Sequence, residues 1–153
     1  MKVLVFHIGR DRYALPLARV DRVLPVARLK ALPGAPEYVR GLLDLHGEPV
    51  PVIDLSSLAG SPPDAVRYDT RILLLEVPFA GRPRRIGVKA ERVTGVATIA
   101  GTPHDAGVAA APWLGQVVPG TAGPAGDGGM LQLLAPEQLL APEVAALVFG
   151  EAA

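Results

Sequence analysis

The sequence predicts a mainly β fold with a short helix at the C-terminus. The first observation is a series of short apolar segments whose side chains alternate with a period of two, as they do along strands. The second is that glycine and proline, 17 and 16 of 153 residues, separate these segments and favour turns. The third is a pair of helical segments, 136–140 and 142–148, that each begin with proline. One domain is long enough to hold all of them.

The elements before residue 60 follow from these patterns. A turn at 9–12 separates two strand-like segments and predicts an N-terminal hairpin. In chain order, the expected elements are a hairpin of 3–8 with 13–17, a helical turn over 18–24, a strand over 26–32, a short helix from Pro36 to Gly41, the central hairpin 41–55, and a helical turn capped by Asp54 that stops at Gly60.

The elements after residue 70 are again mostly strands. A second long hairpin pairs 71–77 with 85–89, and a separate strand is expected over 93–99. Glycine and proline then concentrate between 101 and 129, where 113–118 is still strand-like. We expect 121–129 to be a mobile hairpin loop, because the strand-like segment 130–134 follows at once.

The central segment 41–55 reads Gly-Leu-Leu-Asp-Leu-His-Gly-Glu-Pro-Val-Pro-Val-Ile-Asp-Leu and is the most informative part of the chain. It predicts two short strands joined by a tight turn at Gly47 and Glu48. Pro49 and Pro51 cannot donate ladder hydrogen bonds, so the second strand is expected to have a free edge. A hydrophobic hairpin with a proline-marked edge indicates a surface that meets a partner.

The composition argues against several classes of function. Lys plus Arg and Asp plus Glu both number 15, so no basic excess points to nucleic acid or to an anionic membrane. Cysteine is absent, which excludes a thiolate nucleophile and a zinc–thiolate site. No window approaches the roughly 18 apolar residues of a membrane helix, and the apolar N-terminus ends too soon for a signal sequence. We therefore expect a cytoplasmic protein with no membrane insertion.

Arg82, Arg84 and Arg85 form the one local concentration of positive charge, beside Gly81 and Pro83 in an expected hairpin loop. We interpret them as a solvated turn, because no aromatic residues accompany them to make a phosphate or nucleic-acid site.

A metal site is the main catalytic alternative. Asp44 and His46 share one strand face, and Asp54 lies on the neighbouring strand, so the three could form a carboxylate–imidazole site for a small hydrolase. Neither His7 nor His104 has a spacing that supplies a further ligand. The simpler interpretation is a surface hydrogen-bonded pair and a helix cap, and we expect no cofactor.

The order of the segments also resembles a known family. The matching stretches are 4–9, 12–17, 20–23, 32–36, 38–55, 86–96 and 130–140. The longest is 38–55, which begins Tyr-Val-Arg-Gly-Leu-Leu-Asp-Leu-His-Gly and continues through the central hairpin. On these residues the chain is similar to the CheW-like domain, the coupling module of bacterial chemosensory arrays.

The resemblance implies two small five-stranded β-barrel subdomains packed around a shared core, without a catalytic site. It implies one CheW-like domain over residues 1–150, in which the two barrels interleave, and a tail over 151–153. Family members bind a histidine kinase of the CheA type and the cytoplasmic tip of a methyl-accepting chemoreceptor. Because the chain has neither a kinase nor a response-regulator portion, it looks like the free-standing adaptor.

Two positions depart from the family pattern. The family's Val-x-Glu-Val becomes Val-Asp-Arg-Val with Arg22, and its Asn-Leu-Arg-Gly becomes Asp-Leu-His-Gly with His46. The family's residues can pair as opposite charges, whereas arginine and histidine cannot, so that pair is absent or replaced through Asp21 or Asp44. These departures favour an auxiliary chemosensory pathway over the main flagellar array.

Three function classes therefore remain: an adaptor, a small metal-dependent hydrolase and an unspecialised β-barrel binding module. The adaptor is favoured because it alone explains the order of the motifs. Its partner surface is expected near the central hairpin and the segment 20–23. The candidate contact residues are Val20, Arg22, Val23, Leu42, His46 and Val50.

Overall fold

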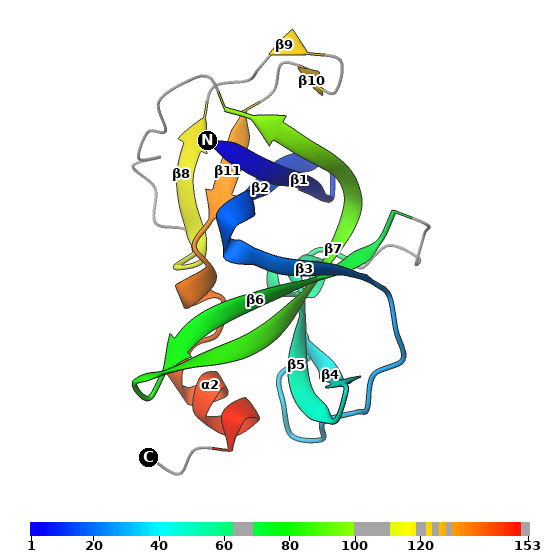
Figure 1. Cartoon of the computed structure of the whole chain (residues 1–153), viewed down its shortest axis with the longest axis vertical. Coiled ribbons are helices and arrows are strands. Elements are labelled where there is room, and N and C mark those ends of the chain that lie inside the picture. The colour runs from blue at the N-terminus through cyan, green and yellow to red at the C-terminus, as the bar shows by residue number, and fades with distance from the viewer. Residues whose placement is uncertain (63–68, 100–110, 119–121, 124–125, 128–129, 151–153) are drawn as a thin grey trace.

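The structure, a computed structural model, describes residues 1–62, 69–99, 111–118, 122–123, 126–127 and 130–150 (Figure 1). Its strands are β1 (Lys2–Ile8), β2 (Asp11–Pro16), β3 (Val20–Pro25), β4 (Val39–Leu45), β5 (Glu48–Asp54), β6 (Arg71–Phe79), β7 (Arg82–Thr98), β8 (Leu114–Val118), β9 (Ala122–Gly123), β10 (Gly126–Asp127) and β11 (Leu131–Leu134). Its helices are α1 (Leu55–Leu58) and α2 (Pro142–Phe149), with 3-10 turns η1 (Leu17–Arg19) and η2 (Pro136–Gln138). The mainly β prediction is confirmed.

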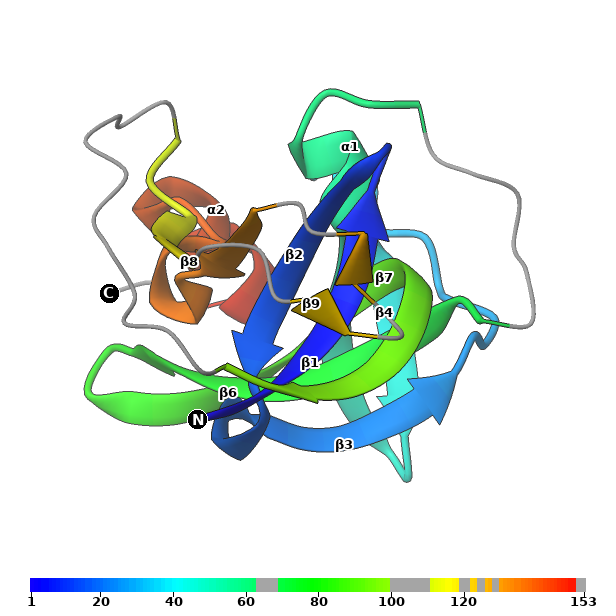
Figure 2. The ribbon, with the colours of Figure 1, turned by 90° about the horizontal axis from the view of Figure 1, so that it is seen from above.

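The long strand β7 joins two groups of strands. Its first half pairs with β6 and, in parallel, with β5, while its second half pairs with β1. One group therefore holds β3, β6, β5 and β4 with the first half of β7, and the other holds β1, β2, β11 and β8 with the second half. Figures 1 and 2 show β7 curving from one group to the other. Two groups of five strands are consistent with the two barrels expected from the family.

Three apolar clusters explain why so many strands are buried on both faces. Val3 and Val5 of β1 lie in a cluster within the β1–β2–β11–β8 group, whereas Leu4 and Phe6 point into a larger cluster shared by both groups. Strand β6 alternates in the same way between the third cluster, within its own group, and the shared one. Each fully buried large side chain contributes about 1.5–3 kcal/mol, so the shared core holds the two groups together.

The structure confirms the elements whose partners lie next to them in the chain. The hairpins β1–β2, β4–β5 and β6–β7 form as expected, and strands β8 and β11 are present. Asp54 caps α1, and Pro142 begins α2, which ends at the left-handed Gly150. None of the helices among the described residues has the length and apolar character needed to cross a membrane.

Three expectations before the central hairpin are wrong. The segment 18–24 is helical only to Arg19, and from Val20 it runs as β3 against β6. Strand pairing to a distant partner overrides the helical spacing of its apolar residues. The expected strand over 26–32 reduces to one bridge between Lys30 and Leu42. The expected helix from Pro36 to Gly41 is a turn, because β4 begins at Val39.

In the second half one expectation is wrong and another is confirmed in part. The segment 93–99 does not form a strand of its own, since through Thr98 it continues β7, which is 17 residues long. In the glycine-rich loop 121–129, β9 and β10 pair as an antiparallel hairpin. The remaining residues of that loop lie outside the described part of the chain, so its expected mobility stays a prediction.

Candidate functional site

Three of the candidate contact residues lie on β3, which pairs with β6 alone among the described strands. Arg22 is exposed, Val20 is half-buried, and Val23 keeps 44% of its surface exposed. The pairing register shifts between Val20 and Arg22, which is the signature of a β-bulge and bends the strand locally. An exposed valine beside an arginine on a strand edge is a surface that another protein can contact.

The β4–β5 turn presents His46 to solvent. Its two central residues are His46 and Gly47, with φ of 52° and 90°, and β5 already begins at Glu48. The expected turn at Gly47 and Glu48 is therefore misplaced by one residue. Positive φ at both central positions is the geometry of a type I′ hairpin turn. The Gly47 amide donates to Oδ1 of Asp44 at 2.7 Å, which stabilises the turn that carries the exposed His46.

The two remaining candidates on this hairpin differ in access. Leu42 is half-buried, and its backbone exchanges two hydrogen bonds of 2.8 Å with Lys30. Val50 has no exposed surface and lies in a core cluster with Leu43 and Val52. The expectation that Val50 contacts a partner is wrong for the folded chain, because its side chain points into the β-sheet core. Leu42 and His46 keep the access that a contact requires.

Arg85 of β7 brings the two parts of the candidate surface together. Its guanidinium lies 3.7 Å from Oδ2 of Asp21 on β3 and 3.2 Å from Oε2 of Glu48 beside the β4–β5 turn. Arg22 directly follows Asp21 in the chain, and His46 lies two residues before Glu48. From the sequence alone, Arg85 is interpreted as part of a solvated turn. Its bridging role could not be found there, because the two carboxylates come from segments 27 residues apart.

The three candidate metal ligands do not come together. Asp44 pairs with Pro49 at one end of β5, while Asp54 ends that strand five residues later, about 17 Å away at the rise of a strand. Asp44 binds the Gly47 amide, and Asp54 is fully buried. Among the described residues, no group of three or more His, Asp or Glu side chains could hold a metal ion. The geometry does not favour the hydrolase.

Asp54 has a structural role instead. Its Oδ1 accepts from the amides of Ser56 and Ser57 at 3.0 and 3.4 Å, which caps α1. Its Oδ2 lies 3.1 Å from Nε of Arg40 on β4 and 3.6 Å from Nζ of Lys89 on β7. The helix cap expected at Asp54 is confirmed. The sequence does not predict the ion pairs of Asp54 with Arg40 and Lys89, because each of these two residues comes from a different strand.

Two tyrosines have perturbed phenols. Burial, with a smaller contribution from the charge of Asp11, raises the pKa of Tyr13. Burial, with a smaller contribution from Glu143, raises the pKa of Tyr38. Both phenols therefore stay protonated at neutral pH, and neither serves as a base or nucleophile there.

The fold and the candidate surface together define a small β-sheet domain with exposed aliphatic and charged side chains on one strand edge and one turn. A sequence profile described as "CheW-like domain" matches residues 2–143. The chain belongs to the CheW-like domain family.

Relatives of known name share part of this sequence. The chain is 26% identical over 111 residues to the chemotaxis protein CheW of Bacillus subtilis, which covers 72% of this chain and 66% of the relative. It is 30% identical over 71 residues to protein PilI of Pseudomonas aeruginosa, 46% of this chain and 40% of the relative. It is 25% identical over 96 residues to the chemotaxis protein CheW of Klebsiella aerogenes, a match that covers 63% of this chain and 55% of the relative. The matches span between 40% and 66% of these relatives' lengths.

A solved structure shares the fold. The crystal structure of the scaffolding protein TtCheW from Thermoanaerobacter tengcongensis superposes with a TM-score of 0.78 at 22% sequence identity. The superposition covers 94% of this chain and 89% of that one. The strand arrangement therefore extends across nearly the whole length of both chains.

Proposed function

We propose that this protein is a non-catalytic cytoplasmic adaptor that couples a chemoreceptor to a histidine kinase of the CheA type in a bacterial chemosensory pathway. The observation that carries the proposal is the family match over residues 2–143, which leaves little of the chain for any other module. Chemotaxis proteins among the relatives support the pathway. We further propose that residues 1–150 act as one CheW-like domain, with 151–153 as a tail.

The candidate surface suits a helical partner. The cytoplasmic tip of a chemoreceptor is a helical hairpin, and an amphipathic helix binds by laying its apolar side chains on an apolar surface. Val23 and the half-buried Val20 of β3 offer such a surface at the edge of the sheet. Contacts of this size are individually weak and gain strength when many copies assemble in an array. An adaptor needs only this binding and no reaction centre.

The charges on the surface favour an auxiliary pathway. Asp21 binds Arg85, and Asp44 binds the Gly47 amide, so the two carboxylates expected to compensate for Arg22 and His46 are engaged elsewhere. Arg22 is exposed and presents a positive charge where the family usually presents a negative one. Because rim charges steer and select partners, the native receptor is expected to carry a carboxylate opposite Arg22.

This charge preference can be tested by reversal. Arg22→Glu is expected to weaken binding to the native receptor about fivefold at low salt, and less at high salt, since an exposed pair contributes up to about 1 kcal/mol. Arg10→Glu, an exposed change of the same charge on the β1–β2 turn, is the matched control and is expected to bind as wild type. The measurement is titration of the receptor's cytoplasmic fragment by calorimetry.

A double variant tests whether these positions set specificity. Arg22→Glu combined with His46→Arg restores the residues that the family usually carries, and it is expected to shift preference toward receptors of a main flagellar array. The assay is a competition between fragments of the two receptor classes for the wild type and the double variant. An unchanged preference would show that Arg22 and His46 do not select the receptor.

A further inference from the structure

A small cavity lies between the β6–β7 hairpin, η2 and α2. Its volume is about 160 Å³, and nine of its ten lining residues are apolar. Its buried lining consists of Val77, Ile86, Pro136, Leu140 and Ala145. Pro78, Glu137 and Pro142 also line it and are exposed, so the cavity opens to solvent on their side. Interiors of folded proteins hold few voids larger than a water molecule, so a cavity of this size and composition requires an explanation.

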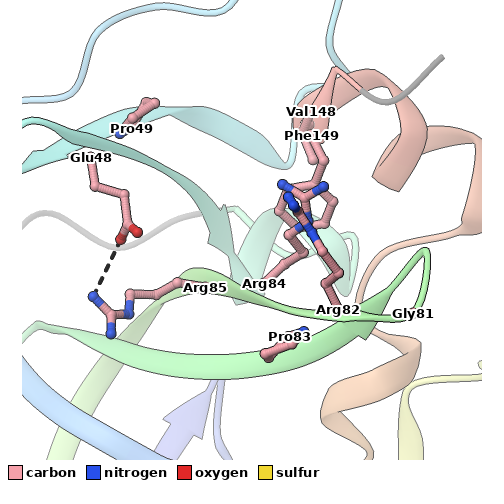
Figure 3. Close-up of a pocket in the computed structure, with 9 residues that line it drawn as sticks. All are labelled: Glu48, Pro49, Gly81, Arg82, Pro83, Arg84, Arg85, Val148 and Phe149. Atoms are coloured by element: carbon pink, nitrogen blue, oxygen red, sulfur yellow. Dashed lines mark hydrogen bonds and ion pairs between the residues drawn. The ribbon is translucent and has the colours of Figure 1, made fainter.

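The walls of the cavity are held apart by aromatic and proline side chains. The rings of Phe79 and Phe149, which both line it, have centroids 5.2 Å apart and are tilted by 38°. The guanidinium of Arg84 lies 5.6 Å from the ring centre of Phe149, and Figure 3 shows the two side chains next to each other. These two contacts restrict the Phe149 ring and oppose its rotation into the cavity. The three prolines in the lining also limit the backbone from which the walls are built.

The lining determines which chemistry the cavity accepts. Among the described residues that form it, Glu137 has the only polar side chain, and its carboxylate is paired with Arg19 of η1. A charged or strongly polar molecule would lose its hydration here without gaining hydrogen-bond partners. An apolar molecule would instead transfer its surface out of water. Engineered apolar cavities of about 150 Å³ in other proteins take up benzene, so the volume suits one small ring.

We propose that this cavity binds a small, uncharged aromatic molecule of about the size of benzene. The Phe79 and Phe149 rings favour an aromatic ligand, because aromatic rings pair with each other in tilted or offset arrangements. A partner protein would have to cover the Arg19–Glu137 pair beside the opening in order to insert a side chain, and burying these charges is costly. A free molecule enters without this cost. The proposal does not depend on the coupling role.

The test titrates the full chain with benzene and follows the methyl groups of Val77, Ile86 and Leu140 by NMR. We expect saturable shifts of these methyl resonances, and none with benzoate, which carries the same ring and a negative charge. Ala145→Leu fills the cavity and is expected to weaken benzene binding about tenfold or more, because its side chain takes up the volume that the ring needs. The matched control is Ala146→Leu, the same change at the next residue of α2, which does not line the cavity, with less than about a twofold effect expected.

Each other outcome contradicts the proposal. Shifts that stay linear in benzene concentration, equal binding of benzoate, or equal losses for Ala145→Leu and Ala146→Leu would each remove the site. Saturable shifts confined to the methyl groups of the exposed Val23 and Leu147 would place benzene on the surface instead. Thermal unfolding of each variant confirms that it is folded. Should Ala145→Leu fail to fold, Ala145→Val, which fills the cavity only in part, is expected to give a smaller loss, and an unchanged affinity would again contradict the proposal.

Discussion

Replacing Asp54 with alanine is expected to destabilise the fold by about 3 kcal/mol. The substitution removes the cap of α1, which contributes roughly 1 kcal/mol, and leaves Arg40 and Lys89 without the buried carboxylate that they share. Removing one member of a buried pair typically costs 3–5 kcal/mol. We place the total loss of stability near the lower end of this range, because the Arg40 side chain is 33% exposed and can be solvated when the carboxylate is removed.

Urea unfolding of wild type, Asp54→Ala and Asp44→Ala tests this expectation. Asp44→Ala is the matched control, since Asp44 is exposed and has one described bond, to the Gly47 amide. Its loss is expected to stay below about 1 kcal/mol. Equal stability of the two variants would show that the Asp54 pairs contribute nothing. Loss of bound metal from Asp54→Ala or Asp44→Ala would instead revive the hydrolase.

Gly41→Ala is expected to cost about 3 kcal/mol or more. Gly41 has φ of 146°, a conformation that residues with a Cβ rarely adopt. An added Cβ would lie 2.4 Å from the carbonyl oxygen of Lys30. That oxygen accepts the Leu42 amide, so the overlap must displace the backbone hydrogen bonds between the two segments. Strain of 1–3 kcal/mol adds to the loss of about 1 kcal/mol for each hydrogen bond.

The Gly47→Ala variant measures the cost of backbone strain without steric overlap of the added Cβ. Gly47 has φ of 90° in the β4–β5 turn, but nothing lies within 4 Å of its added Cβ. Its loss is expected to be about 1 kcal/mol, because only the conformational strain applies. The measurement is again the urea midpoint of both variants. If Gly41→Ala were no worse than Gly47→Ala, the close approach of Lys30 to β4 would be wrong.

The hairpins could be predicted from the sequence because their strands are neighbours in the chain. A turn signal between two alternating segments is sufficient for β1–β2, β4–β5 and β6–β7. Strand β3 was missed because its partner β6 begins at Arg71, about fifty residues further on. No local pattern reports such a pairing, so helical spacing was the stronger signal over 18–24.

The candidate site could be predicted only in part from the sequence. The family's pattern placed attention on Arg22, Val23 and His46, and all three are exposed. Val50 was misplaced because its side chain is on the same face of β5 as Val52, and that face packs in a core cluster with residues of β4 and β6. The link through Arg85 requires three segments to meet, which only the folded chain shows.

Co-sedimentation with receptor-bearing vesicles tests the adaptor role most directly. Vesicles that carry the receptor's cytoplasmic fragment are mixed with the kinase, with and without this protein, and the pelleted kinase is measured. Coupling predicts that the kinase pellets with the vesicles only when the chain is present, and less when it carries Arg22→Glu. Kinase sedimentation that is the same with and without the chain would contradict the account.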